Sequence, residues 1–205
     1  ASRRTDIQDP LADWEIYSMH PDGNGLYKHT MNRSYDWAAT WSPHNNEIIY
    51  VSNFLNDDVV SSYEGESVEV GDTDIFSTDF FGEKIERLTE NELPHEGAPL
   101  WSPDGSTILF HADLEESGIF EIHTMDADGS NLKTLTNLGN YNWDPVWSPD
   151  GSKVAFAHLE RTWDVYIVHA DGTNPNAIIE SENNNWKPVW SPNGMEIAFA
   201  SDRSG

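Results

Sequence analysis

Tryptophan is the residue type whose number and spacing most clearly suggest a binding chemistry. The chain of 205 residues has nine. Four begin a repeated Trp-Ser-Pro turn, and we expect them to lie in the core: Trp41, Trp101, Trp147 and Trp190. The other five, outside that turn, are Trp14, Trp37, Trp143, Trp163 and Trp186. Indole faces stack on the apolar faces of sugars, pack against peptides and attract ammonium groups. These five are therefore candidates for a ligand site.

Motifs for catalysis or cofactor binding are not found. The sequence has no G-x-S-x-G elbow, no H-E-x-x-H, no P-loop and no dinucleotide fingerprint. The stretch DADGSN at 126–131 resembles the start of a calcium loop, but Leu, Lys and Thr follow it, and the glutamate that such a loop needs at its twelfth position is missing. We therefore expect no enzyme, no catalytic residue, no cofactor and no identifiable metal site. Calcium bound by converging carboxylates elsewhere stays open.

The net charge of −25 restricts the classes of partner. Such a surface repels phosphate backbones and anionic lipid, so we expect no nucleic acid as a partner. The charge serves solubility or, alternatively, attracts cations or a basic partner. There is no cysteine, and no apolar run approaches the roughly 20 residues that span a bilayer. Membrane insertion is therefore not expected.

A repeat organises the whole chain. Its first element reads WSPHNNEIIYVSN from residue 41, WSPDGSTILFHAD from 101, WSPDGSKVAFAHL from 147 and WSPNGMEIAFASD from 190. A second element ends in Gly23, Gly82, Gly129 and Gly172, three of them in an Asp-Gly turn. Each repeat provides four strands with period-two apolar alternation, and no helical period is sustained. A spacing of 40 to 45 residues with four strands per unit is typical of a propeller blade.

The strand count predicts an all-β propeller of four four-stranded blades in a single domain, residues 1–205. The chain opens with a third and a fourth strand and closes with a first and a second. Pairing these two ends would close the ring and hide both sheet edges. Residues 1–12 are a predicted N-terminal extension, and 53–73 a predicted loop insertion rich in carboxylates. The alternatives are a fragment of a larger propeller and a ring shared by several chains.

The repeats resemble those of the TolB family of WD-like β-propellers. The resemblance rests on the WSPDG turns, the following I-x-F, the I-Y strand, and the Asp-Gly turn that leads to Leu-Thr, over about residues 14–202. It implies a periplasmic or secreted protein that binds other proteins. The chain departs from the family in having four repeats, where the family usually has more, and it has no recognisable protease domain.

The five extra tryptophans fall on a single predicted face of the disc. In an antiparallel meander, the start of strand one and the start of strand three share that face, and the Asp-Gly turns lie opposite. Three of the five lie four residues before a turn tryptophan, where Gly97 stands in the remaining blade. The predicted ligand-binding residues at the channel mouth are Trp14, Tyr35, Trp37, Tyr141, Trp143, Trp163 and Trp186. The alternative is that these rings only cap a small core.

The sequence thus favours a non-enzymatic, extracytoplasmic binding propeller. A protein or peptide ligand is favoured by the family resemblance, and a glycan by the aromatic and Asn-rich loops. A propeller-fold polysaccharide-active enzyme and a structural module of a larger multidomain protein are the alternatives. A monomer is expected, with an oligomer as the other possibility.

Overall fold

The computed structural model describes residues 14–32, 34–53, 73–89, 96–115 and 117–204. Within these ranges the chain forms antiparallel strands and no helix, so the all-β prediction is confirmed. No helix in these ranges could cross a membrane. The predicted extension at 1–12 and nearly all of the predicted insertion at 53–73 lie outside the described residues.

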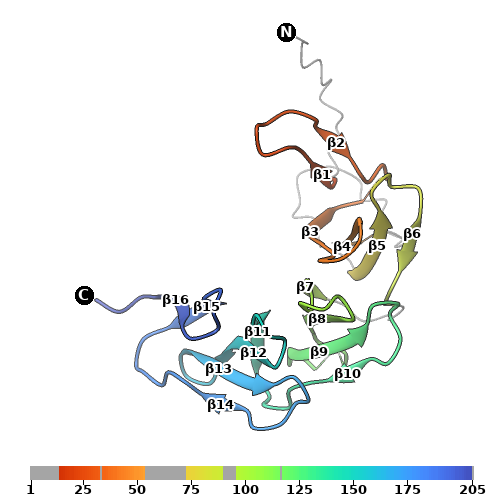
Figure 1. Ribbon diagram of the computed structural model, residues 1–205. Coiled ribbons are helices and arrows are strands. Elements are labelled where there is room, and N and C mark those ends of the chain that lie inside the picture. Colours follow the sequence, from red (N-terminus) through yellow and green to blue (C-terminus); the bar gives the residue numbers. More distant parts are fainter. Residues whose placement is uncertain (1–13, 33, 54–72, 90–95, 116, 205) are drawn as a thin grey trace, which may run out of the picture.

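Three four-stranded sheets follow one another along the chain, with a two-stranded sheet before and after them (Figure 1). The first pair is β1 (Tyr17–Ser18) and β2 (Tyr27–Lys28). The complete blades contain β3 (Asp36–Trp41), β4 (Glu47–Ser52), β5 (Asp74–Asp79) and β6 (Ile85–Arg87); β7 (Gly97–Trp101), β8 (Thr107–Ala112), β9 (Glu121–Asp126) and β10 (Lys133–Thr134); and β11 (Tyr141–Trp147), β12 (Lys153–Leu159), β13 (Trp163–His169) and β14 (Asn176–Ala177). The last pair is β15 (Asn185–Trp190) and β16 (Ile197–Ser201).

The Trp-Ser-Pro turns reverse the chain between the first and second strands as the sequence predicts. In the second blade, the Ser102 amide donates to the Thr107 carbonyl, and Gly105 takes a φ of 69°. That left-handed conformation is readily available to glycine. The Asp104 carboxylate accepts hydrogen bonds from the Ser102 hydroxyl and the Ser106 amide, which fixes the turn locally.

The core lies between successive sheets and is made chiefly of the second and third strands. Tyr50, Phe110 and Phe156, on three second strands, are buried. One apolar cluster joins Ile49 and Ile75 of one blade to Phe110 and Met125 of the next. Neighbouring blades therefore bury each other's faces, which no blade could do alone.

The four turn tryptophans do not share one environment. Trp101 is buried, and Trp147 and Trp190 are half-buried. Trp41 is 46% exposed, so its predicted core position is wrong. Its ring stacks on Phe80 and meets the edge of the His29 ring, which directly follows β2, and these contacts cover only part of it.

The sheets form an open arc, with the first strands on its inner side and the fourth strands on its outer side (Figure 1). The sheets β1–β2 and β15–β16 lie at opposite ends of this arc and remain separate. The predicted four-bladed closed ring is therefore not confirmed, since no sheet is closed in the described residues. The chain has the equal numbers of strand pairs that a closed ring requires, but the curvature of three complete blades does not bring the two terminal sheets together.

Candidate functional site: an aromatic cleft

A β-bulge on each first strand sets the position of the residues that form the site. The strand register shifts directly after Trp37, Gly97, Trp143 and Trp186. The residue that follows has a positive φ in each case, 49° to 53°, at Ala38, Ala98, Asp144 and Lys187. Such a conformation is strained for residues other than glycine, and bulges re-aim side chains. The same β-bulge thus occurs on four first strands, which lie on the inner side of the arc.

Three of the extra tryptophans line one cleft between the third blade and β15–β16. The cleft has a volume of about 450 Å³ and is lined by Trp143, Asp144, Ala157, Trp163, Asn184, Trp186 and Lys187. The rings of Trp143 and Trp163 are stacked, with centroids 5.4 Å apart. Tyr141 meets both rings, at 5.6 Å from Trp143 and 6.5 Å from Trp163. We call this site the aromatic cleft.

The exposure of these rings shows that they do more than fill the core. Trp143 is 39% exposed and Tyr141 is 37% exposed, and Trp163 and Trp186 are half-buried. A stacked indole pair that remains open to solvent offers a large apolar surface with defined geometry.

The other three predicted residues lie elsewhere. Trp14, 62% exposed, makes an edge contact with Tyr35 at 5.7 Å beside the first sheet pair. Trp37 is half-buried at its own bulge and is not among the residues that line the cleft. Of the seven predicted residues, the structure therefore brings four together at the aromatic cleft. Trp14 and Tyr35 form a separate pair, and Trp37 lies apart from both groups.

His111 belongs to the same aromatic group, and sequence reasoning missed it. Gly97 leaves room in the second blade that the other blades fill with tryptophan, and a Cβ at Gly97 would lie 2.6 Å from the His111 Nε2 atom. The imidazole lies 6.1 Å from the Trp143 ring and 6.2 Å from that of Phe120. Burial lowers the pKa of His111 to about 4, with a smaller contribution from His123, so the ring is neutral at pH 7. Position 97 carries glycine where the other three first strands carry tryptophan, and this difference is the sequence feature that could have pointed to His111.

A set of hydrogen bonds, which we call the polar latch, holds each first strand against the preceding blade. In the best-formed example, the hydroxyl of Thr136 donates to Glu121 and accepts from the Ile122 amide. Asn142 donates to the same Glu121 carboxylate at 3.0 Å and to the Phe120 carbonyl at 2.8 Å. Asn142 is buried between Tyr141 and Trp143, so the latch fixes the strand that carries the cleft.

The latch also uses asparagines of the Asn-rich loops, which favour a glycan ligand on sequence grounds alone. Asn185 donates to Asp164 at 3.2 Å and accepts from the Ser201 hydroxyl at 2.9 Å. Asn184 is fixed by two hydrogen bonds to Asp202. At the junction between the third blade and β15–β16, Ile179 stands at the position equivalent to Thr136, so this latch has no threonine hydroxyl. Asn142 and Asn185 therefore have structural partners and are fully buried, which leaves Asn184 as the amide on the wall of the cleft.

The charged groups of the cleft come from the bulges. Asp144 is half-buried, and this burial raises the pKa of its carboxyl, while the charge of Lys187 acts in the opposite direction. Both residues line the cleft beside the indoles. The site can therefore stack a flat or apolar ligand face and offer one acidic and one basic group at its edge.

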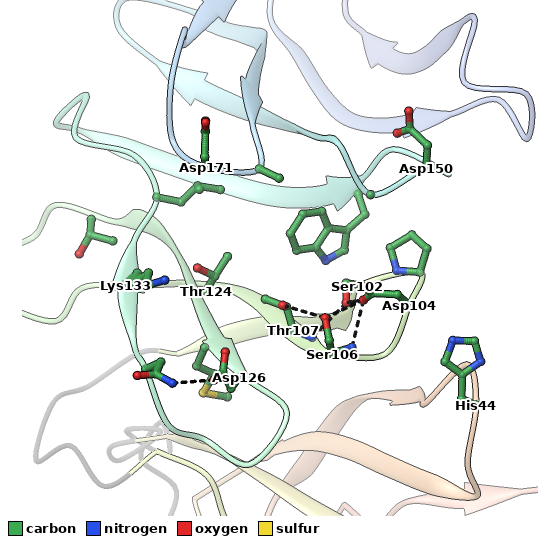
Figure 2. Close-up of a pocket in the computed structure, with 18 residues that line it drawn as sticks. His44, Ser102, Asp104, Ser106, Thr107, Thr124, Asp126, Lys133, Asp150 and Asp171 are labelled. Atoms are coloured by element: carbon green, nitrogen blue, oxygen red, sulfur yellow. Dashed lines mark hydrogen bonds between the residues drawn. The ribbon is translucent and has the colours of Figure 1, made fainter.

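A larger cavity of about 700 Å³ lies on the side of the Trp-Ser-Pro turns (Figure 2). Its carboxylates are engaged in the turns themselves. Figure 2 shows Asp104 bonded to Ser102 and Ser106, and Asp150 accepts the equivalent bonds in the next blade. These bonds lower the pKa of both carboxyls to about 2. Within the described ranges, no group of three or more His, Asp or Glu residues is arranged to hold a metal ion.

Successive four-stranded antiparallel sheets, with their first strands facing a common axis, define a β-propeller repeat protein. The family model of the TolB beta propeller domain matches residues 59–163, and the chain belongs to this family. No curated protein matches the chain.

Solved structures show the same fold. TolB from Acinetobacter baumannii is 20% identical, with a TM-score of 0.54 over 89% of this chain and 53% of that one. A putative TolB from Agrobacterium tumefaciens is 22% identical, with a TM-score of 0.57 over 86% and 73%. An oligogalacturonate lyase from Vibrio parahaemolyticus is 16% identical, with a TM-score of 0.67 over 91% and 52%. The chain thus spans about half of the Acinetobacter TolB and of the lyase.

Proposed function

We propose that the protein is a non-enzymatic binding propeller whose ligand occupies the aromatic cleft. The observation that supports this most directly is the convergence of Trp143, Trp163 and Trp186 on one open cleft. Two of these indoles stack on each other and keep exposed surface, although burying it would stabilise the fold. Rigid sheets hold them, and a rigid aromatic site binds with little loss of side-chain entropy.

A peptide segment of another protein is the ligand class that we favour. Membership of the TolB family supports it, because the resemblance to that family implies a protein that binds other proteins. The cleft suits a segment with an apolar or aromatic side chain for the indoles and charged neighbours for Asp144 and Lys187. The same family membership supports a location outside the cytoplasm, periplasmic or secreted.

A glycan is the second candidate, and the stacked pair of Trp143 and Trp163 favours it. Such a pair presents a flat apolar surface of the kind on which sugar rings pack. The structural likeness to an oligogalacturonate lyase also keeps a polysaccharide-active enzyme as an alternative. Release of unsaturated or reducing ends from an oligosaccharide by the purified chain would replace the binding proposal with that alternative.

Fluorescence titration tests the proposal, because indoles in the site respond to a ligand. The purified chain is titrated with synthetic peptides rich in Trp, Tyr and Pro and with neutral and acidic oligosaccharides. We expect saturable quenching with one class, lost in Trp143→Ala and Trp186→Ala and kept in Trp14→Ala, which is a matched control outside the cleft. Circular dichroism verifies that the variants are folded. Equal responses of all three variants would contradict the proposed site.

A further inference from the structure

The bulge residues of the first strands differ in charge from one blade to the next. In the first two complete blades they are Ala38 and Ala98, whereas Asp144 and Lys187 occupy the two bulges that border the aromatic cleft. We infer that Asp144 selects an arginine side chain of the ligand, so that the aromatic cleft binds a peptide segment in which arginine stands beside an aromatic or apolar residue. This inference rests on the proposed function and names its ligand more closely.

The Asp144 carboxylate is partly withdrawn from water without gaining a partner. It is half-buried, and this burial raises its pKa. In the part of the chain that the structure describes, it accepts no hydrogen bond and takes part in no salt bridge. Other buried carboxylates have donors: Asp36 accepts from the Ser52 hydroxyl, and Asp113 from the Gly118 amide. A buried charge is costly unless a partner compensates it, and a cation of the ligand would relieve this cost at Asp144.

The neighbouring polar groups of the cleft leave this carboxylate without a contact. The charge of Lys187 favours the ionised form of Asp144, but Lys187 is exposed, and the two side chains form no salt bridge in the described residues. The side-chain amide of Asn184 donates to Asp202, and its oxygen accepts from the Trp163 amide. Asp144 therefore remains the acceptor in the cleft that a ligand can engage.

A guanidinium group fits both kinds of surface that the cleft offers. Its planar fork of N–H donors pairs with a carboxylate through two parallel hydrogen bonds, and its flat face stacks on aromatic rings. Asp144 directly follows Trp143 in the chain, and the stacked rings of Trp143 and Trp163 line the same cleft. One arginine side chain can therefore contact the carboxylate and an indole face together. The charge of −25 on the chain also attracts a cationic peptide, and this attraction does not extend to neutral or acidic oligosaccharides.

Calorimetric titration with three capped peptides tests this selection. The peptides share the sequence Gly-Tyr-Xaa-Tyr-Gly and carry arginine, its neutral isostere citrulline, or glutamate in the central position. We expect the native chain to bind the arginine peptide at least about ten-fold more tightly than the citrulline peptide, because hydrogen bonds to a charged group contribute a factor of this size. Asp144→Asn should remove most of this preference. Glu160→Gln should keep it and controls for the change in net charge, since Glu160 is exposed and does not line the cleft.

Urea unfolding separates this role of Asp144 from a structural one. Asparagine, like aspartate, tolerates the positive φ of 51° at this position, and the substitution removes a charge that has no partner among the described residues. We therefore expect the urea midpoint of Asp144→Asn to equal or exceed that of the native chain. A lower midpoint together with an unchanged preference for arginine would assign a structural role to Asp144 and overturn the inference. A preference that survives the substitution would overturn it at any midpoint.

The outcomes with the native chain, which need no variant of Asp144, distinguish this inference from the proposed function. Equal affinities for the arginine and citrulline peptides, with binding lost in Trp143→Ala, would leave the cleft as the binding site and refute the selection by Asp144. Tightest binding of the glutamate peptide would refute it as well and point to Lys187. Binding of none of the three peptides would overturn both the inference and the favoured ligand class, and saturable binding of an oligosaccharide at the same indoles would then assign the cleft to a glycan.

Discussion

The polar latch yields a prediction about stability that can be worked out from its contacts. In Thr136→Val the shape of the side chain is kept, but the buried Ile122 amide loses its acceptor and Glu121 loses a hydroxyl donor. A buried amide without a partner costs about 1 to 3 kcal/mol, and a hydrogen bond to a charged group contributes about 1.5 to 3 kcal/mol. Glu121 retains donors from Leu138, Gly139 and Asn142, so we take the lower half of the combined range, about 2.5 to 4 kcal/mol.

Urea unfolding followed by circular dichroism measures this loss. With a slope of about 2 kcal/mol per molar urea, the middle of the usual range for a small protein, the midpoint should fall by about 1 to 2 M. Thr134→Val is the matched control, because Thr134 is an exposed threonine only two residues before Thr136, and its effect should stay within about 0.5 kcal/mol. Equal midpoints for the two variants would refute the claim that the latch stabilises the junction between blades.

Three further predictions concern the histidines and the glycines. Burial lowers the pKa values of His111 and His123 to about 4, below the unfolded value of 6.5, so the unfolded chain binds more protons between these pH values. The free energy of unfolding should therefore fall as the pH drops from 6.5 to 4, and His111→Phe should flatten part of this slope in urea titrations at several pH values. Gly97→Ala should lower the melting temperature, because the new methyl group would meet the His111 ring, and adding His111→Ala should recover part of the loss; no recovery would contradict the contact. Gly129→Ala should lower the melting temperature more than Gly23→Ala, since both have φ near 84° but only Gly129 abuts a neighbouring backbone; equal losses would mean that this contact between blades contributes nothing.

The repeat predicted the local fold well, because its signals are local. The Trp-Ser-Pro turn and the alternating second strand fix where the chain reverses and which side chains are buried. Ring closure depends instead on the angle between successive sheets, which is set by packing such as that of Ile49 and Ile75 against Phe110. No short motif encodes that angle, so a balanced strand count could not distinguish a closed ring from an arc.

The candidate site was predictable in part for the same reason. Equivalent repeat positions placed Trp143 and Trp186 on one face, and Trp163 followed from the third strand. The bulges that direct Asp144 and Lys187 into the cleft depend on backbone geometry, and the residues at these bulges share no residue type that could be recognised in the sequence. The contact of His111 with Trp143 crosses between blades, so it needed the packed structure.

The most direct test of the binding proposal is fluorine NMR of the chain labelled with 5-fluorotryptophan, with each of the nine signals assigned by substitution. The same peptides and oligosaccharides are added one at a time. We predict that a bound ligand shifts the signals of Trp143, Trp163 and Trp186 and leaves those of Trp14 and Trp37 in place. A ligand that binds while only the turn tryptophans respond would contradict it and would place the site on the opposite face.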